Sequence, residues 1–131
     1  MSALDTVLIE PLGAHRDTRG LLFEPLGAGE LDAQRNVHVV LTSPGAVRGN
    51  HAHRTAVEMT TVVGPCLVRL KEPAGMRDVN VPPGAVWRFT IPPGVVHAYR
   101  NTGPDPLILV SFSNEPHDAA GVGTWREPIL E

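Results

Sequence analysis

Proline and glycine interrupt this chain so often that long helices are excluded. The sequence of 131 residues contains 13 Gly and 13 Pro. Proline breaks helices and removes a hydrogen-bond donor from a sheet, and glycine adopts the backbone angles of tight turns. The turn-forming clusters lie between apolar runs, at Ser43-Pro44-Gly45, Pro82-Pro83-Gly84, Pro92-Pro93-Gly94 and Gly103-Pro104-Asp105-Pro106. This spacing predicts many short strands.

The apolar runs between these turns are rich in β-branched residues, which favours strands. No stretch has the three-and-four spacing of an amphipathic helix, so we expect little helix. Trp87 and Phe89 alternate with Arg88, as in a sheet with one face on a core. The pattern predicts an all-β sandwich, barrel or jelly roll. The predicted strands are Thr6–Glu10, Leu21–Leu26, Asn36–Thr42, Ala46–His53, Val57–Val63, Leu67–Lys71, Arg77–Val81, Val86–Ile91, Val96–Arg100 and Leu107–Ser113.

Length and charge narrow the class of protein. A chain of 131 residues fits one domain, because a second would lack a core. We therefore expect a single domain over residues 1–131, with residues 115–131 packed on it as a tail. The net charge is −3, and no basic stripe with interleaved aromatic residues is present, which argues against a nucleic-acid partner.

The N-terminus and the single cysteine bear on the compartment. Residues 1–13 include Asp5 and Glu10 and have no long apolar core, so we expect neither a signal peptide nor a membrane span. A cytoplasmic location is the resulting prediction. Cys66 is the only cysteine, which excludes an intrachain disulfide and a thiolate metal cluster.

Three histidines and a glutamate form the candidate site. His51 and His53 lie in an extended segment, where the side-chain period of two places both on one face, close enough to share an ion. Glu58 can enter from the next strand, and His97 follows a Pro-Pro-Gly turn. Three imidazoles and a carboxylate suit a divalent transition metal such as Zn, Fe, Ni, Co or Mn.

Two longer patterns resemble the motifs of the cupin superfamily. They read Gly45-x5-His51-x-His53-x4-Glu58-x5-Gly64 and Pro92-x-Gly94-x2-His97-x3-Asn101. The spacing before Gly64 differs by one residue, and the second motif lacks a glycine six positions before Pro92. The resemblance implies a double-stranded β-helix (jelly roll) of the RmlC-like cupin type. It also implies that His51, His53, Glu58 and His97 bind a metal in the barrel mouth.

The N-terminal half resembles the dTDP-4-dehydrorhamnose 3,5-epimerases. The similar segments are Ile9-Glu10-Pro11, Asp17-Thr18-Arg19-Gly20, Phe23-Glu24 and Val47-Arg48-Gly49-x-His51. The resemblance implies that Arg19 and Arg48 bind substrate, with Arg48 on the nucleotide phosphates, and that His51 is a base beside the sugar ketone. The chain departs from these enzymes in Leu107–Ser113, which lacks their proton-donating tyrosines, and in lacking their later aspartate partner of the base.

Shorter sugar-nucleotide cupins are also similar, namely the 3,4-ketoisomerases and the cupin domain of capsule-synthesis enzymes. The similar segments are Arg48-Gly49-Asn50-His51-x-His53, Pro92-Pro93-Gly94-x2-His97 and Ser113-Asn114-Glu115-x2-Asp118. In the ketoisomerases the paired histidines act as acid and base, whereas the capsule cupin holds a metal, which Glu58 favours here. Tyr99 lies two residues after His97, so its side chain points to the same face of the strand. Three roles stay open for it: a catalytic acid, a residue of the pocket wall, or a core residue. His15, His38 and His117 show no partner spacing and are interpreted as surface or structural residues.

Three functions stay open at this stage. The first is an isomerase or epimerase on a nucleotide-linked 4-keto-6-deoxy sugar (a dTDP- or UDP-sugar) in cell-surface polysaccharide biosynthesis, with His51, His53 and Tyr99 as catalytic candidates. The second is a metal-dependent dioxygenase-type cupin acting on a small molecule. The third is a non-catalytic sugar- or metabolite-binding cupin. The family resemblance implies a homodimer.

Overall fold

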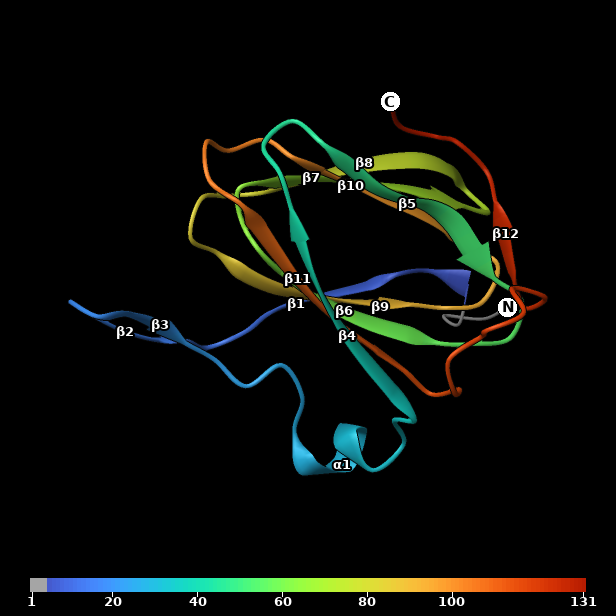
Figure 1. The fold of residues 1–131 in the computed structure, drawn as a ribbon, viewed down its shortest axis with the longest axis horizontal. Coiled ribbons are helices and arrows are strands. Elements are labelled where there is room, and N and C mark those ends of the chain that lie inside the picture. The colour runs from blue at the N-terminus through green and yellow to red at the C-terminus, as the bar shows by residue number, and fades with distance from the viewer. Residues whose placement is uncertain (1–4) are drawn as a thin grey trace.

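The computed structural model describes residues 5–131 and is built almost entirely of strands (Figure 1). Two five-stranded antiparallel sheets have the orders β1-β9-β6-β11-β4 and β12-β5-β10-β7-β8, and β2 and β3 pair separately. The predicted all-β jelly roll is thereby confirmed. The elements are β1 (Leu8–Pro11), β2 (His15–Asp17), β3 (Gly20–Leu22), α1 (Ala28–Leu31), β4 (Asn36–Thr42), β5 (Val47–His53), β6 (Glu58–Val63), β7 (Cys66–Glu72), β8 (Gly75–Val81), β9 (Val86–Ile91), β10 (Val96–Asn101), β11 (Leu107–Ser113) and β12 (Thr124–Arg126).

The core lies between the two sheets, which face each other in Figure 1. Val68 and Leu70 of β7 and Phe89 and Ile91 of β9 are buried on the inner faces. Burying each such side chain stabilises the fold by about 1.5–3 kcal/mol. The alternation predicted for Trp87 and Phe89 therefore describes the inner face of β9 correctly.

The outer face of β9 differs from the prediction. Arg88 was expected to face away from the core, yet it is buried under the N-terminal segment. Its guanidinium donates to the Pro25 carbonyl at 3.0 Å and pairs with Glu10 at 3.0 Å. Because the N-terminal segment covers this strand, the charge is paired rather than solvated.

The N-terminal region contains a hairpin where one strand was predicted. The predicted strand Leu21–Leu26 is wrong beyond Leu22, since β3 ends there and β2 pairs with it. The Asp17 carboxylate accepts from the Arg19 amide at 2.8 Å and closes the turn. Pro25 has no amide proton to continue the ladder. The hairpin extends away from both sheets (Figure 1).

The C-terminal segment returns to the sheet edge as β12, antiparallel to β5. Asn50, which is buried, holds the residues that follow: it donates to the Leu130 carbonyl at 2.9 Å and accepts from the amides of Ile129 at 2.9 Å and Leu130 at 3.0 Å. The prediction of one domain over residues 1–131 includes residues 1–4, which lie outside the described residues, and stays a prediction. Within residues 5–131 no helix has the length and apolar character needed to cross a bilayer.

We expect Asn50→Ala to lower the free energy of unfolding by about 2–4 kcal/mol, because the three hydrogen bonds of a buried side chain are lost together. Urea denaturation followed by fluorescence measures this change. The matched control is Asn114→Ala, which removes one hydrogen bond to the Val57 amide at 2.9 Å and should cost much less. Equal unfolding midpoints for the two variants would contradict an anchoring role for Asn50.

Candidate functional site

The four predicted ligands converge at one end of the space between the sheets. His51 and His53 come from β5, His97 from β10, and Glu58 begins β6 of the opposite sheet. His97 is paired directly across from His51 in the antiparallel register. The imidazole centroids are separated by 5.1 Å (His51 to His53), 4.7 Å (His51 to His97) and 5.6 Å (His53 to His97). One ring nitrogen from each histidine lies within 4.8 Å of the others.

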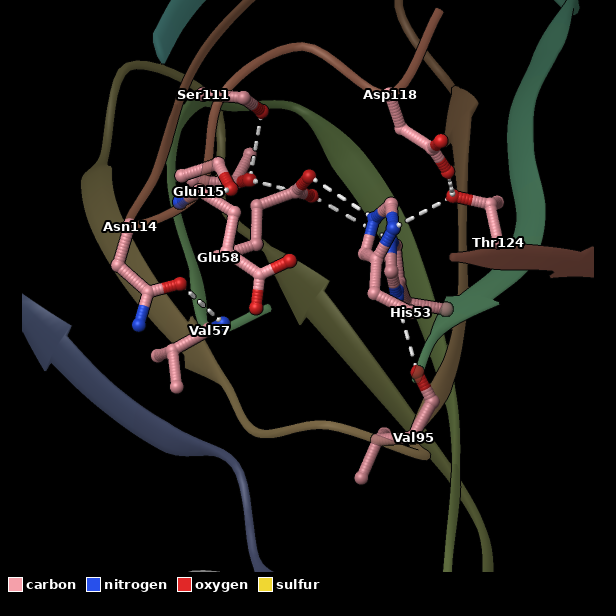
Figure 2. A network of polar contacts seen from close by, with 12 residues as sticks. His53, Val57, Glu58, Val95, Ser111, Asn114, Glu115, Asp118 and Thr124 are labelled. Carbon is pink, nitrogen blue, oxygen red and sulfur yellow. Dashed lines mark hydrogen bonds and ion pairs between the residues drawn. The ribbon is translucent and has the colours of Figure 1, made fainter. Parts of the chain in front are cut away.

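His53 and His97 each bring a buried Nε2 atom close to the Glu58 carboxylate, and Figure 2 shows this contact for His53. The distances are 3.2 Å from His53 Nε2 to Oε2 and 3.4 Å from His97 Nε2 to Oε1. The Nδ1 atom of His97 lies 3.1 Å from the Val95 carbonyl oxygen, which can only accept a hydrogen bond. In the neutral ring the proton of His97 is therefore on Nδ1, and Nε2 presents a lone pair to the site.

Burial and charge set the protonation of this cluster. Burial, followed by the proximity of His97, lowers the pKa of His51 to about 4, so His51 is neutral at neutral pH. Burial opposes ionisation of Glu58, but contacts with His53 and His97 outweigh it and hold the pKa of that carboxyl below its usual range. The cluster thus combines a buried carboxylate with an imidazole that can accept a proton or bind a cation.

A bulge in β5 brings Arg48 to the same face as the histidines. Residues three apart on a regular strand point to opposite faces. Here Asn50 is an extra residue in the pairing with β10, with φ of 59°, and Gly49 has φ of 95°. Arg48 is therefore paired with Tyr99, whose side chain shares the inner face with His97. Glycine is required at position 49, because a Cβ there would lie 2.6 Å from the His97 carbonyl oxygen.

A cavity of about 360 Å³ opens on one side of the imidazoles. His51, Tyr99, Arg48 and Arg126 line it. Arg126 was not predicted from the sequence, because no motif includes it; it reaches the cavity because β12 places it opposite His51. Within residues 5–131 neither arginine forms an ion pair with an acidic side chain. The two free guanidinium groups make this cavity suited to an anion.

A second cavity, of about 730 Å³, opens on the other side of the cluster. Its lining includes His53, Glu115, His117 and Asp118. His38 lines both cavities. Sequence reasoning missed His38 and His117 as site residues, because neither has a fixed spacing from the motif histidines. Strand pairing brings His38 to the site, since it lies opposite Ser111 in the β4–β11 ladder.

The remaining predicted residues differ in position. Tyr99 is buried, its ring centroid is 5.9 Å from that of His97, and its hydroxyl has no hydrogen-bond partner among the described residues. Burial raises the pKa of Tyr99 well above its usual range. Arg19 is not brought to the cluster within this chain: it lies exposed on the β2–β3 hairpin, where it pairs with Asp17. Its role in binding substrate stays a prediction.

The two sheets and the histidine-lined mouth make this chain an RmlC-like cupin that resembles sugar-nucleotide isomerases and epimerases. The family described as "Polysaccharide biosynthesis C-terminal domain" matches residues 15–125. Because this match covers most of the sequence, the chain belongs to that family. A comparison with curated protein sequences finds no match.

Solved structures share the fold. CapF of Staphylococcus aureus, a capsular polysaccharide assembling protein, is 25% identical with a TM-score of 0.66; the alignment covers 92% of this chain and 33% of CapF, so the chain spans about a third of that protein. QdtA, a sugar 3,4-ketoisomerase of Thermoanaerobacterium thermosaccharolyticum solved with TDP, is 18% identical (TM-score 0.68, coverage 92% and 88%). The rmlC epimerase of Mycobacterium tuberculosis is 16% identical (TM-score 0.71, coverage 96% and 70%). The last two likenesses show the fold alone.

We expect Gly49→Ala to be more destabilising than Gly94→Ala. Both glycines have positive φ, 95° and 86°, so alanine adds strain of about 1–2 kcal/mol at either site. Only at Gly49 does the new Cβ also meet backbone, whereas none lies within 4 Å of Gly94. Urea unfolding of the two variants measures the difference. Equal free energies of unfolding would show that β10 can move away from Gly49 without cost.

Proposed function

We propose that this chain is an isomerase or epimerase acting on a nucleotide-linked 4-keto-6-deoxy sugar in the synthesis of a surface polysaccharide. The observation that carries the proposal is a neutral imidazole, His51, beside a cavity that also presents two arginines without an acidic partner among residues 5–131. The family and the fold of its structural neighbours support the same class of substrate.

The two arginines supply the recognition of the nucleotide diphosphate. Each guanidinium presents a planar array of donors that matches phosphate oxygens, and a pair of arginines can bind both phosphates. Arg48 and Arg126 come from neighbouring strands and line one cavity with His51. A diphosphate bound there lies next to the imidazoles, so the attached sugar is close to the histidine cluster.

His51 is the proposed proton acceptor. A ketone acidifies the neighbouring C–H bond; when that bond breaks, the proton moves to the imidazole and the electron pair moves onto the ketone oxygen. Return of a proton to the other face of that carbon re-forms the ketone and gives the epimer. Return of a proton to the former ketone carbon, with the proton of the adjacent hydroxyl moving to the former ketone oxygen, gives the isomeric ketone. The low pKa of His51 keeps its ring neutral, as a base must be before the reaction.

The residues present also fit a divalent transition metal. The buried Nε2 atoms of His53 and His97 lie 3.2 Å and 3.4 Å from the Glu58 oxygens without hydrogen bonds, and a cation between these atoms would be bound by all of them. His51, His53, Glu58 and His97 are the residues that would hold the ion. When bound, the ion would supply positive charge beside the ketone oxygen. His51 would then be a ligand or the base, and the experiments below separate the two roles.

We expect incubation in deuterated water with dTDP-4-keto-6-deoxyglucose, or its UDP counterpart, to introduce deuterium at carbon 3 of the sugar. Exchange precedes reprotonation into product, so mass spectrometry detects it even when turnover is low. His51→Asn should reduce the exchange rate by about 10²-fold or more if His51 is the base. Binding of the sugar nucleotide without exchange would contradict the isomerase proposal and favour a non-catalytic binding cupin. Oxygen consumption would favour a dioxygenase.

Arg126→Ala provides the test of substrate recognition within the same assay. Losing one charged contact should raise the substrate concentration for half-maximal exchange by about 10-fold, with a smaller effect at saturation. Arg35→Ala is the matched control, because Arg35 is an exposed arginine whose guanidinium contacts only the carbonyls of Asp32 and Gln34. Identical saturation curves for the Arg126 variant and wild type would remove Arg126 from the diphosphate site.

Protein purified without a histidine tag should contain about one transition metal per chain, measured by elemental analysis. We expect Glu58→Ala and His53→Ala to lower this content, because each removes a proposed ligand. His15→Ala is the control, since His15 is exposed on the β2–β3 hairpin. Unchanged metal content in both ligand variants would show that the metal binds elsewhere. Deuterium exchange by a metal-free protein would show that His51 acts as the base without a metal.

The proposed homodimer has support in the exposed face of β4. Val37, Val39 and Leu41 are 53%, 64% and 63% exposed on this edge strand. Apolar side chains in a row on an unpaired strand edge are typical of a surface that another chain covers. The β2–β3 hairpin also projects from the sheets with Leu22 exposed (Figure 1).

A further inference from the structure

A chain of hydrogen bonds connects the C-terminal segment to the outer ring nitrogen of His53 (Figure 2). His53 Nδ1 lies 3.1 Å from the hydroxyl oxygen of Thr124. The Thr124 hydroxyl in turn donates to Asp118 Oδ2 at 3.3 Å. The same carboxylate oxygen accepts from the Gly123 amide at 2.8 Å, which holds Asp118 in place.

The chemistry of the three groups determines which of them donates in each of these hydrogen bonds. A carboxylate can only accept, so the single hydroxyl proton of Thr124 points to Asp118. The Thr124 oxygen then presents lone pairs to His53, and the ring must supply the proton of the contact from Nδ1. The opposite arrangement would point a hydroxyl lone pair at the Asp118 carboxylate 3.3 Å away, which is electrostatically unfavourable. A proton on His53 Nε2 would instead face Glu58 at 3.2 Å, but that contact does not have hydrogen-bond geometry, so the contacts with Thr124 decide the tautomer.

We propose that Thr124 and Asp118 are positioning residues that hold the proton of His53 on Nδ1 and so present the Nε2 lone pair to the site. The inference rests on the proposed function, because an exposed lone pair on Nε2 is what either a metal ligand or a proton acceptor needs. Their proposed role is to act through His53 and not on the substrate. Sequence reasoning found no aspartate partner for a base, and Asp118 reaches the imidazole only through the hydroxyl of Thr124.

His97 provides an internal comparison. Its Nδ1 atom is held by the Val95 backbone carbonyl at 3.1 Å, so no side-chain substitution removes that acceptor. His53 and His97 both turn Nε2 toward Glu58, but only His53 depends on a side chain for its tautomer. Substitutions at Thr124 should therefore change His53 and leave His97 unchanged.

The experiment measures the ring nitrogen signals of ¹⁵N-labelled histidine by NMR in alkaline buffer, in the metal-free protein and after adding Zn²⁺. We expect wild type to show His53 only as the Nδ1–H tautomer. Thr124→Val removes the acceptor and should give a mixture of tautomers at His53, with zinc affinity reduced by about 10- to 100-fold. Thr124→Ser keeps the hydroxyl and should behave as wild type. Asp118→Asn can donate to Thr124 and should also give a mixture.

Thr55→Val is the matched control for a merely structural role. The Thr55 hydroxyl donates to Glu115 at 2.6 Å, so this contact also holds the C-terminal segment to the barrel but does not touch His53. It should leave the His53 tautomer unchanged. An Nε2–H tautomer in wild type, or unchanged His53 signals in Thr124→Val, would overturn the proposal. An Nδ1–H tautomer that depends on Thr124 in a protein that binds no zinc would instead contradict the proposed metal site and leave the positioning role intact.

Discussion

The register between β5 and β10 is the constraint on which the site depends. It places His51 opposite His97, and the bulge at Gly49 and Asn50 then lets Arg48 share the inner face with Tyr99. Asn50, the extra residue of this bulge, also binds the backbone of Ile129 and Leu130. One local irregularity therefore aligns the histidines with an arginine and attaches the C-terminal segment that carries Arg126.

Burying a carboxylate in the mouth of the barrel has a cost that its neighbours must offset. Glu58 is 5% exposed, and its oxygens contact His53, His97 and the hydroxyl of Thr60, which bonds in turn to Ser111 at 2.7 Å. Removing one partner of such a group leaves a charge without compensation, which is more costly than never burying it. The polar interior of this end of the barrel is thus a connected network, and the apolar core occupies the remainder.

The sequence predicts most of the fold because its turns and its strand period are local signals. The histidine cluster follows from the same signals: a period of two aligns His51 with His53, and the turn before His97 starts the strand that pairs with them. Residues brought in by non-local pairing were missed. Arg126 and His38 depend on the β12–β5 and β4–β11 ladders, and buried Arg88 depends on the N-terminal segment that covers β9. The spacing of residues along the sequence does not predict these contacts.

The charged side chains around the imidazoles differ between the two sides of the site. One cavity presents Arg48 and Arg126, whereas the other presents Glu115 and Asp118, and Glu58 lines both. A substrate of the proposed kind, with a diphosphate at one end and an uncharged sugar at the other, would fit this arrangement in one orientation only, because the acidic side repels phosphate. His51 lines both cavities, so it would lie where the charged and uncharged parts of such a substrate join. A site that only recognised nucleotides would have no need of a histidine cluster at this junction, which is why the proposed chemistry is assigned to the imidazoles and the recognition to the arginines.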